Sequence, residues 1–284
     1  MKRFFRLDRR GFLIGAAGVA LAGCDRISET DQAQDVFDGV NELSYKAQRL
    51  LIGADRLAPE FAATEISRNF RANGSIDPKA PSYRELVRDQ FTSWKLNVGG
   101  LVEKARDYSL DELRALPSRT QITRHDCVEG WSCIGKWKGV LLSTLLDEVR
   151  VKPQARYVVF YCADRLGADE AASNPNEAES DQETDPDEQP PQTGAALDDP
   201  STHYYETIDL VDARHPQTIL AYDMNDRVLP VAHGAPLRLR VERQLGYKMA
   251  KYIMRIELVE SFAGIGLGKG GYWEDRGYDW YAGI

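Results

Sequence analysis

Apolar and polar residues alternate along this chain in patterns that predict both helices and strands. Residues 31–52 carry apolar side chains at intervals of three and four, which predicts an amphipathic helix. Gly53 and Pro59 interrupt that pattern and end the helical region. Residues 94–98 instead alternate apolar and polar positions, which predicts a strand, and the pair Gly99-Gly100 predicts a turn after it.

A short helix with recognisable ends is predicted soon afterwards. Ser109 can cap its first turn, and Glu112 stands three residues later, as in a capping box. Leu116 is its last apolar position, and Pro117 just beyond it marks the end. Residues 141–149 predict a further helix with the same kind of spacing.

Short apolar runs predict three more strands, at residues 157–161, 237–241 and 252–258. Short strands mixed with short helices predict an α+β fold. The sequence has no P-loop and no Gly-x-Gly-x-x-Gly motif after a strand, and no helical pattern follows the Gly-rich residues 264–268. We therefore do not expect a nucleotide-dependent enzyme.

The segment 168–200 has no apolar period and is rich in Asp, Glu, Pro, Asn and Gln. Such a composition buries too little apolar surface to offset chain entropy, so we predict a disordered loop inserted in the fold. Residues 169–199 hold eleven acidic and no basic side chains, so their charge alone exceeds the net charge of -8, and the basic N-terminus offsets part of it. The acidity is local, and it argues against nucleic acid as a partner.

The first residues are typical of an export signal, which we assign to residues 1–23. Arg9-Arg10 precedes an apolar run and resembles a twin-arginine signal, which carries folded proteins with their cofactors already inserted. Leu21-Ala22-Gly23-Cys24 resembles a lipobox, so we expect a periplasmic protein anchored through a lipidated Cys24. A general secretory signal and an uncleaved anchor are the alternatives, although the apolar run is short for a bilayer span. Residues 24–64 form the predicted N-terminal helical segment.

Three cysteines besides Cys24 have to be explained. In an oxidising compartment an odd number leaves at least one free or metal-bound. A Cys127–Cys133 disulfide is one alternative, and a zinc site built from His125, Cys127, Cys133 and Cys162 is another, although its spacing is unusual. The third alternative is a single thiolate bound to a metal that accepts soft ligands.

The residues around Cys127 favour the single thiolate. Positions 124–131 bring together a cation, an imidazole, a thiol, a carboxylate and an indole, and a core strand rarely holds so many polar groups without a use for them. Within this stretch, Cys127-Val128-Glu129-Gly130-Trp131 resembles the molybdenum-ligand loop of the sulfite-oxidase superfamily. It is most similar to the branch that contains the catalytic subunit of the periplasmic methionine-sulfoxide reductase.

Two further segments carry the same resemblance. His233 to Arg238, followed by Gly246-Tyr247-Lys248 and Lys251, resembles the pterin-binding segment of that superfamily. Ser67 to Phe70 is similar to its early loop over the pterin. Together the three segments span about residues 65–260, so the resemblance covers most of the predicted domain 65–284.

The resemblance implies a sulfite-oxidase fold that encloses one molybdenum-molybdopterin per chain, with Cys127 as the metal ligand. The positions that it assigns to cofactor binding are Asn69, Arg71, Ala72, Cys162, His233, Arg238, Lys248, Met249, Ala250 and Lys251. Because molybdopterin ends in a phosphate, the cations of Arg238, Lys248 and Lys251 suit it on chemical grounds. A solvated strand face is the alternative for Arg238 and Lys251.

The chemistry expected of such a site is the transfer of one oxygen atom and two electrons. If Glu129 faces the metal, its carboxylate repels sulfite unless Arg124 offsets it, whereas it can deliver the proton that oxide reduction consumes. We therefore expect a reductase of S-oxides or N-oxides, with Cys127, Glu129 and Arg124 as the catalytic residues. A sulfite oxidase is the first alternative, and a cofactor-free lipid-anchored binding protein is the second.

The expected partners are a small-molecule oxide or oxyanion and a separate electron-transfer protein. The sequence has no Cys-x-x-Cys-His haem-attachment motif, so we expect electrons to be exchanged with a membrane or soluble haem protein. Membrane contact is expected only through the N-terminal lipid or signal.

Overall fold

The computed structural model describes residues 31–53, 55–165 and 203–284. The chain divides into two compact units, Met1–Gly53 and Ala54–Ile284. The export signal predicted at residues 1–23 lies outside the described residues, as does the acidic insertion predicted at residues 168–200.

The described part of the first unit is one helix, α2 (Asp31–Ile52), which ends where the sequence pattern places its end. Leu43, Leu50 and Leu51 are exposed on it. No helix among the described residues combines the length and the apolar character that a membrane crossing requires.

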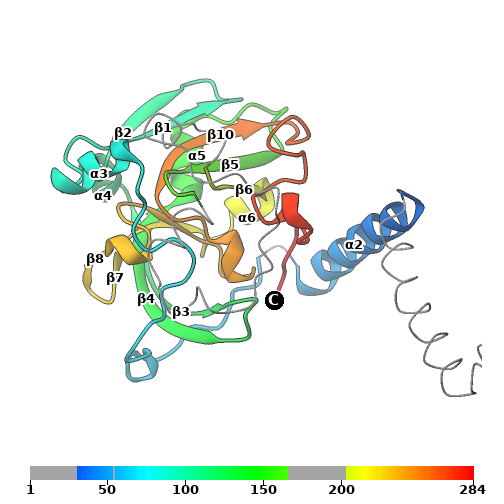
Figure 1. Cartoon of the computed structure of the whole chain (residues 1–284), viewed down its shortest axis with the longest axis horizontal. Coiled ribbons are helices and arrows are strands. Elements are labelled where there is room, and N and C mark those ends of the chain that lie inside the picture. Colours follow the sequence, from blue (N-terminus) through cyan, green and yellow to red (C-terminus); the bar gives the residue numbers. More distant parts are fainter. Residues whose placement is uncertain (1–30, 54, 166–202) are drawn as a thin grey trace, which may run out of the picture. The chain divides into compact units, whose positions relative to one another are not determined.

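The second unit is built on two five-stranded sheets (Figure 1). The first sheet has the order β2-β1-β10-β5-β6. β1 and β10 are parallel, and all other neighbours in this sheet are antiparallel. Its strands are β1 (Lys95–Gly100), β2 (Arg106–Ser109), β5 (Tyr157–Cys162), β6 (Tyr205–Asp209) and β10 (Ile253–Val259).

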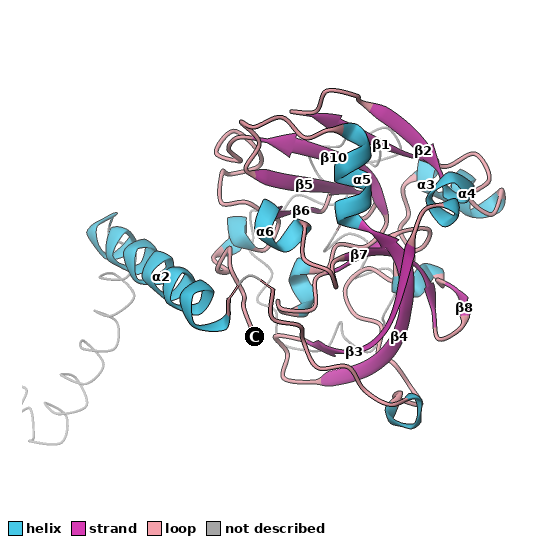
Figure 2. Ribbon diagram, turned by 180° about the vertical axis from the view of Figure 1, so that it is seen from behind, coloured by secondary structure: helices cyan, strands magenta, loops and turns pink. Residues whose placement is uncertain are grey.

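The second sheet is antiparallel and centres on a long hairpin. Its order is β3-β4-β7-β8, and β9 also pairs with β7. Figure 2 shows β4 as a long, strongly curved strand. The strands are β3 (Ser118–Asp126), β4 (Ser132–Leu141), β7 (Ile219–Met224), β8 (Arg227–Val228) and β9 (Arg238–Arg240).

Short helices connect the strands and complete the core. The α-helices are α3 (Pro81–Arg88), α4 (Leu110–Ala115), α5 (Leu142–Val149) and α6 (Leu210–Ala213). Single 3-10 turns are η1 (Ala63–Glu65), η4 (Val231–His233), η5 (Gly246–Lys248) and η6 (Glu274–Arg276). The buried face of α5, with Leu142, Leu145 and Leu146, belongs to the same apolar cluster as Phe160 of β5 and Ile256 of β10.

The α+β class predicted from the sequence is confirmed, and most predicted elements are present. Ser109 caps α4, and its hydroxyl and the Glu112 carboxylate form the predicted capping box. The turn predicted at Gly99-Gly100 is wrong, because both residues continue β1 and pair with Glu257 and Leu258 of β10.

Candidate active site

Cys127 lies in the turn that joins β3 to β4. The backbone N–H of Gly130 donates to the Cys127 carbonyl at 3.1 Å, and the Cys127 N–H donates to the Trp131 carbonyl at 3.0 Å. Gly130 has a φ of 83°, a left-handed conformation that glycine adopts readily. The tight turn directs the Cys127 side chain inward, where the residue is only 8% exposed.

A cavity opens beside this thiol and receives side chains from distant parts of the chain. Its walls come from the segment before α3, from the β3–β4 turn, from the ends of β5 and β9, from η5 and from the C-terminal segment. The lining residues are Asn73, Gly74, Cys127, Val128, Glu129, Asp164, Tyr204, Arg238, Gly246, Tyr247, Met249, Ala250, Lys251, Trp273 and Tyr278.

The Cys127 thiol is held in a mixed environment. The side-chain amide of Asn73 lies 3.5 Å from its Sγ. Burial raises the pKa of the Cys127 thiol, and the nearby Glu129 carboxylate adds to that rise, while backbone N–H groups and Arg71 oppose it. A bound metal cation would favour the thiolate over the thiol. Cys127, Cys133 and Cys162 are all free, so the Cys127–Cys133 disulfide is not formed.

Glu129 lies at the cavity with a different cationic partner from the one expected. Its carboxylate is 3.5 Å from the Arg71 guanidinium and accepts a hydrogen bond of 2.8 Å from the Trp131 indole. Arg71 also lies over the Trp131 ring. Arg124, the expected partner, is exposed and pairs with Asp126 at 2.8 Å. Alternation along β3 explains this difference, since Arg124 points away from the buried face.

Arg238 is a buried cation that lacks a counter-charge. It is 3% exposed, and no acidic side chain in the described ranges forms an ion pair with it. One guanidinium nitrogen donates to the His233 carbonyl at 3.1 Å, while its Nε has no hydrogen-bond partner among the described residues. Burial, and secondarily Arg240, lower the pKa of Arg238 to about 9. An anion in the cavity would compensate this charge.

His233 and Lys251 stand close to that cation. Burial, followed by the charges of Arg238 and Lys251, lowers the pKa of His233 to about 4. The Nδ1 of His233 is also without a partner in the part of the chain that the structure describes. The Lys251 ammonium donates to the carbonyls of Asn73 and Ser75, which ties the early segment to the cavity wall.

Two residues assigned to the cofactor lie elsewhere. Lys248 is fully buried, but its ammonium binds the carboxylates of Glu206 and Glu274 and does not line the cavity. It is therefore not the free cation that we expected at a phosphate. Cys162 is 3% exposed within the apolar core, where burial raises its pKa well above the ordinary value.

In the segment before α3, the residues that line the cavity lie a few positions later in the chain than expected. Asn69 is exposed, and neither Asn69 nor Ala72 lines the cavity, whereas Asn73 and Gly74 do. Met249 and Ala250 line it as the resemblance implied. Tyr247 lies in the segment that resembles the pterin-binding one, whereas sequence reasoning missed Asp164, Tyr204, Trp273 and Tyr278.

These residues fit a molybdopterin that bears molybdenum. A buried thiol would ligate the metal, and the uncompensated Arg238, with Lys251 beside it, offers the charge that a phosphate requires. Buried polar atoms on His125, His233 and Arg238 have no hydrogen-bond partner among the described residues, as expected where a polar ligand binds. No cluster of three or more His, Cys, Asp or Glu side chains that could hold a metal ion occurs in the described ranges, so the zinc alternative finds no support there.

Comparison with known proteins agrees with this geometry. Residues 84–184 and 187–263 match the family described as the oxidoreductase molybdopterin binding domain. A protein of Azospira oryzae, named putative protein-methionine-sulfoxide reductase subunit YedZ1, is 32% identical over 97% of this chain and 86% of its own length. The protein-methionine-sulfoxide reductase catalytic subunit MsrP of Ralstonia nicotianae is 32% identical over 70% of this chain.

The chain spans only 53% of the length of that second relative. Among solved structures, the sulfane dehydrogenase SoxCD of Paracoccus pantotrophus aligns with a TM-score of 0.44 and 19% identity. That alignment covers 60% of this chain and 39% of the SoxCD chain.

Proposed function

The chain belongs to the family of oxidoreductases with a molybdopterin-binding domain, and we propose that it reduces S-oxides or N-oxides, with methionine sulfoxide as the leading substrate. In the proposed reaction, the S–O bond of a sulfoxide breaks. The products are a thioether and one water molecule, and two electrons and two protons are consumed. When bound, the molybdenum centre supplies the oxygen-atom transfer chemistry.

The residues of this chain would divide the remaining work. Cys127 would hold the metal through its thiolate, and Arg238, Lys251 and His233 would bind the polar groups of molybdopterin. The Asn73 amide, 3.5 Å from the thiol, would orient the ligating sulfur. Val128 and Glu129 directly follow Cys127 in the turn, and both line the cavity.

The residues that line the cavity around Cys127 are the observation that favours oxide reduction over sulfite oxidation. The wall holds the Glu129 carboxylate and four aromatic side chains, Tyr204, Tyr247, Trp273 and Tyr278. A carboxylate repels sulfite at close range, whereas aromatic rings favour a neutral sulfur compound through sulfur–aromatic contacts. Glu129 would donate a proton to the departing oxygen.

Sulfite oxidation is the second candidate, and Arg71 is the observation in its favour. Its guanidinium offsets the Glu129 charge at 3.5 Å, so that an anion would meet a smaller repulsion. Both side chains of this pair are about half exposed, so the compensation is weakened by solvent.

The electron donor would be a separate protein. The Azospira relative is named a subunit, and the sequence studied here has no haem-attachment motif of its own. We propose that a haem protein delivers the electrons and that the N-terminal signal exports this chain to the periplasm, with Cys24 as a lipid anchor. Labelled-lipid incorporation in wild type and Cys24→Ser, together with cell fractionation, tests export and anchoring.

The test of the reaction is a direct comparison of its two directions. Protein purified with its cofactor would be assayed for methionine-sulfoxide reduction with a reduced viologen dye, and for sulfite oxidation with an oxidised acceptor. Rates would be normalised to bound molybdenum. We expect efficient sulfoxide reduction, and efficient sulfite oxidation without detectable oxide reduction would overturn the proposal.

A further inference from the structure

A buried chain of polar side chains runs through the second unit and ends at a histidine next to the metal ligand. His125 is 1% exposed and lies two residues before Cys127, so both side chains share the buried face at the end of β3. Its ring lies between Phe70 and Trp131, with centroid distances of 5.8 and 5.7 Å. The proposed function does not use this histidine.

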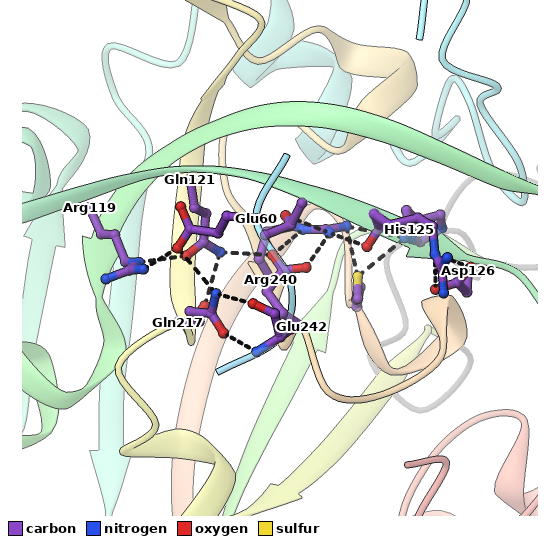
Figure 3. A network of polar contacts seen from close by, with 12 residues as sticks. Glu60, Arg119, Gln121, His125, Asp126, Gln217, Arg240 and Glu242 are labelled. Carbon is purple, nitrogen blue, oxygen red and sulfur yellow. Dashed lines mark hydrogen bonds and ion pairs between the residues drawn. The ribbon is translucent and has the colours of Figure 1, made fainter. Parts of the chain in front are cut away.

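Arg240 determines which ring nitrogen of His125 carries the proton. A guanidinium nitrogen of Arg240 lies 3.1 Å from the Nδ1 of His125 (Figure 3). Because a guanidinium has only donors, Nδ1 has to be the acceptor, and the ring proton is therefore on Nε2. The Met249 sulfur also lies beside this contact, 3.2 Å from Nδ1.

Arg240 in turn is fixed by two partners. Glu242 accepts two hydrogen bonds from its guanidinium, at 2.9 and 2.6 Å, and both side chains are fully buried. The guanidinium also stacks on the Trp137 ring at 4.4 Å. Gln121 donates to Glu242 at 2.8 Å, so every carboxylate oxygen is engaged. A bidentate ion pair of this kind holds the arginine in one orientation.

The proton on Nε2 has no acceptor in the part of the chain that the structure describes. Nε2 is buried and makes no hydrogen bond there. It lies against Gly246, a residue of the cavity wall, where an added Cβ would come within 2.5 Å of it. Leaving such a donor unpaired is costly, and so an acceptor beyond the described residues is called for.

We infer that His125 donates its Nε2–H to the bound molybdopterin, with the Glu242–Arg240 pair holding the ring in the required tautomer. Molybdopterin carries ring-nitrogen, carbonyl and phosphate acceptors, so its chemistry is suited to a neutral N–H donor. Gly246, which lines the cavity, carries no side chain toward the ring, so the ring edge packs directly against that wall. This inference rests on the proposed binding of molybdopterin and is independent of the direction of catalysis.

The first test measures how firmly the holoenzyme keeps its cofactor. Molybdopterin released after dilution would be followed by pterin fluorescence in wild type, His125→Phe, His125→Gln, Thr123→Val and Thr120→Val. Because the Thr123 hydroxyl accepts a hydrogen bond from Arg240, Thr123→Val reports on the same network, and Thr120→Val on the exposed face of β3 is the unchanged control. We expect His125→Phe to release the cofactor about tenfold faster, since it keeps a ring and loses the donor. His125→Gln should stay within about threefold of wild type, because its amide N–H replaces the donor.

The second test reads the tautomer in the wild-type holoenzyme itself. Selective 15N labelling of the four histidines in the holoenzyme would show the tautomer of each ring, with His125→Gln identifying the signal. We expect a neutral ring protonated at Nε2, with a slowly exchanging proton. A proton on Nδ1, or a release rate in folded His125→Phe equal to that of wild type, would overturn the inference. Wild type that holds no molybdopterin would overturn the proposed function as well.

Discussion

The guanidinium of Arg71 lies 3.5 Å from the carboxylate of Glu129, and both side chains border the β3–β4 turn that carries Cys127. The same carboxylate accepts a hydrogen bond from the Trp131 indole, over which Arg71 is stacked. Glu129 is thus held at the cavity by two partners, and its charge is partly offset there. This arrangement makes the role of Glu129 open to a direct kinetic test.

Glu129→Gln should lower sulfoxide reduction about ten- to a thousandfold, because the amide keeps the size and removes the proton that the carboxyl group would donate. Sulfite oxidation, where present, should hold steady or rise as the repulsion is relieved. Steady-state kinetics of both reactions, normalised to bound molybdenum, provide the measurement. Glu103→Gln is a matched control, since Glu103 also pairs with a half-exposed arginine, Arg150.

If Glu129 only shapes the turn, both activities and the molybdenum content should fall together in Glu129→Gln. Sulfoxide reduction per molybdenum equal to that of wild type would exclude the carboxyl group as the proton donor.

Cys127→Ser should abolish turnover and remove the thiolate-coordinated Mo(V) signal in electron paramagnetic resonance. Serine supplies a harder oxygen donor and shifts the potential of the metal. Cys133→Ser is the control, because Cys133 is a free cysteine that does not line the cavity. Native signal and full turnover in Cys127→Ser would remove Cys127 from the metal site.

Arg238→Met should weaken molybdopterin binding about tenfold to a hundredfold, the usual effect of losing a hydrogen bond to a charged group. The cofactor-free protein should instead gain about 1 kcal/mol in its free energy of unfolding, because a buried and uncompensated charge is removed. Urea unfolding of the cofactor-loaded and the cofactor-free protein tests whether the substitution destabilises the first and stabilises the second. Equal destabilisation of the two forms would show that Arg238 serves packing and not the ligand.

The pH dependence of stability should carry the signature of His233, whose pKa is about 4 in the folded chain against an ordinary value near 6.5. The folded state favours the neutral ring, so this contribution is complete above about pH 6.5 and is lost as the pH falls towards 4. The loss should amount to about 1–2 kcal/mol, since partial exposure weakens the effect.

Urea unfolding of cofactor-free protein at pH 7 and pH 4.5 measures that loss. His233→Gln should show a smaller difference between the two pH values than wild type. An identical difference in both proteins would assign the acid sensitivity to other groups.

Deletion of residues 170–199 should leave folding and cofactor content nearly unchanged. The Tyr204 N–H donates to the Asp164 carbonyl at 2.8 Å, so the chain is already closed on itself where the acidic segment leaves and returns. A shorter connection between these residues slightly lowers the entropy of closure. Soluble yield and molybdenum per chain are the measurements, and loss of either would show that the segment supports the fold.

Sequence patterns predicted the elements in which one face is apolar, such as α2, α5 and β5. They did not predict the β3–β4 hairpin, because the buried face of β3 carries Gln121, Thr123 and His125, so that no apolar alternation is visible. Propensity reasoning has no means of recognising a strand whose inward side chains are polar and hydrogen-bonded to Arg240 and Glu242 of a distant segment.

The candidate site was predictable where its chemistry is local, and less so where it depends on contacts between distant residues. The string around Cys127 predicts a ligand loop from neighbouring residues alone, yet the pairing of Lys248 with Glu206 and Glu274 depends on tertiary contacts. The same holds for Arg71, which replaces the nearby Arg124 as the partner of Glu129. Basic side chains that are equivalent in a sequence pattern have different roles in the structure, because tertiary contacts decide which acidic side chain neutralises each of them.

The ion pairs of Lys248 also bear on how the chain can be engineered. Through Glu274 they anchor the segment that brings Trp273 and Tyr278 to the cavity, so these residues serve as a wall of the site. Trimming the chain before Trp273 would remove that wall and take away Glu274, which leaves Lys248 paired with Glu206 alone. An affinity tag fused after Ile284 should therefore follow a flexible spacer that leaves this anchor undisturbed.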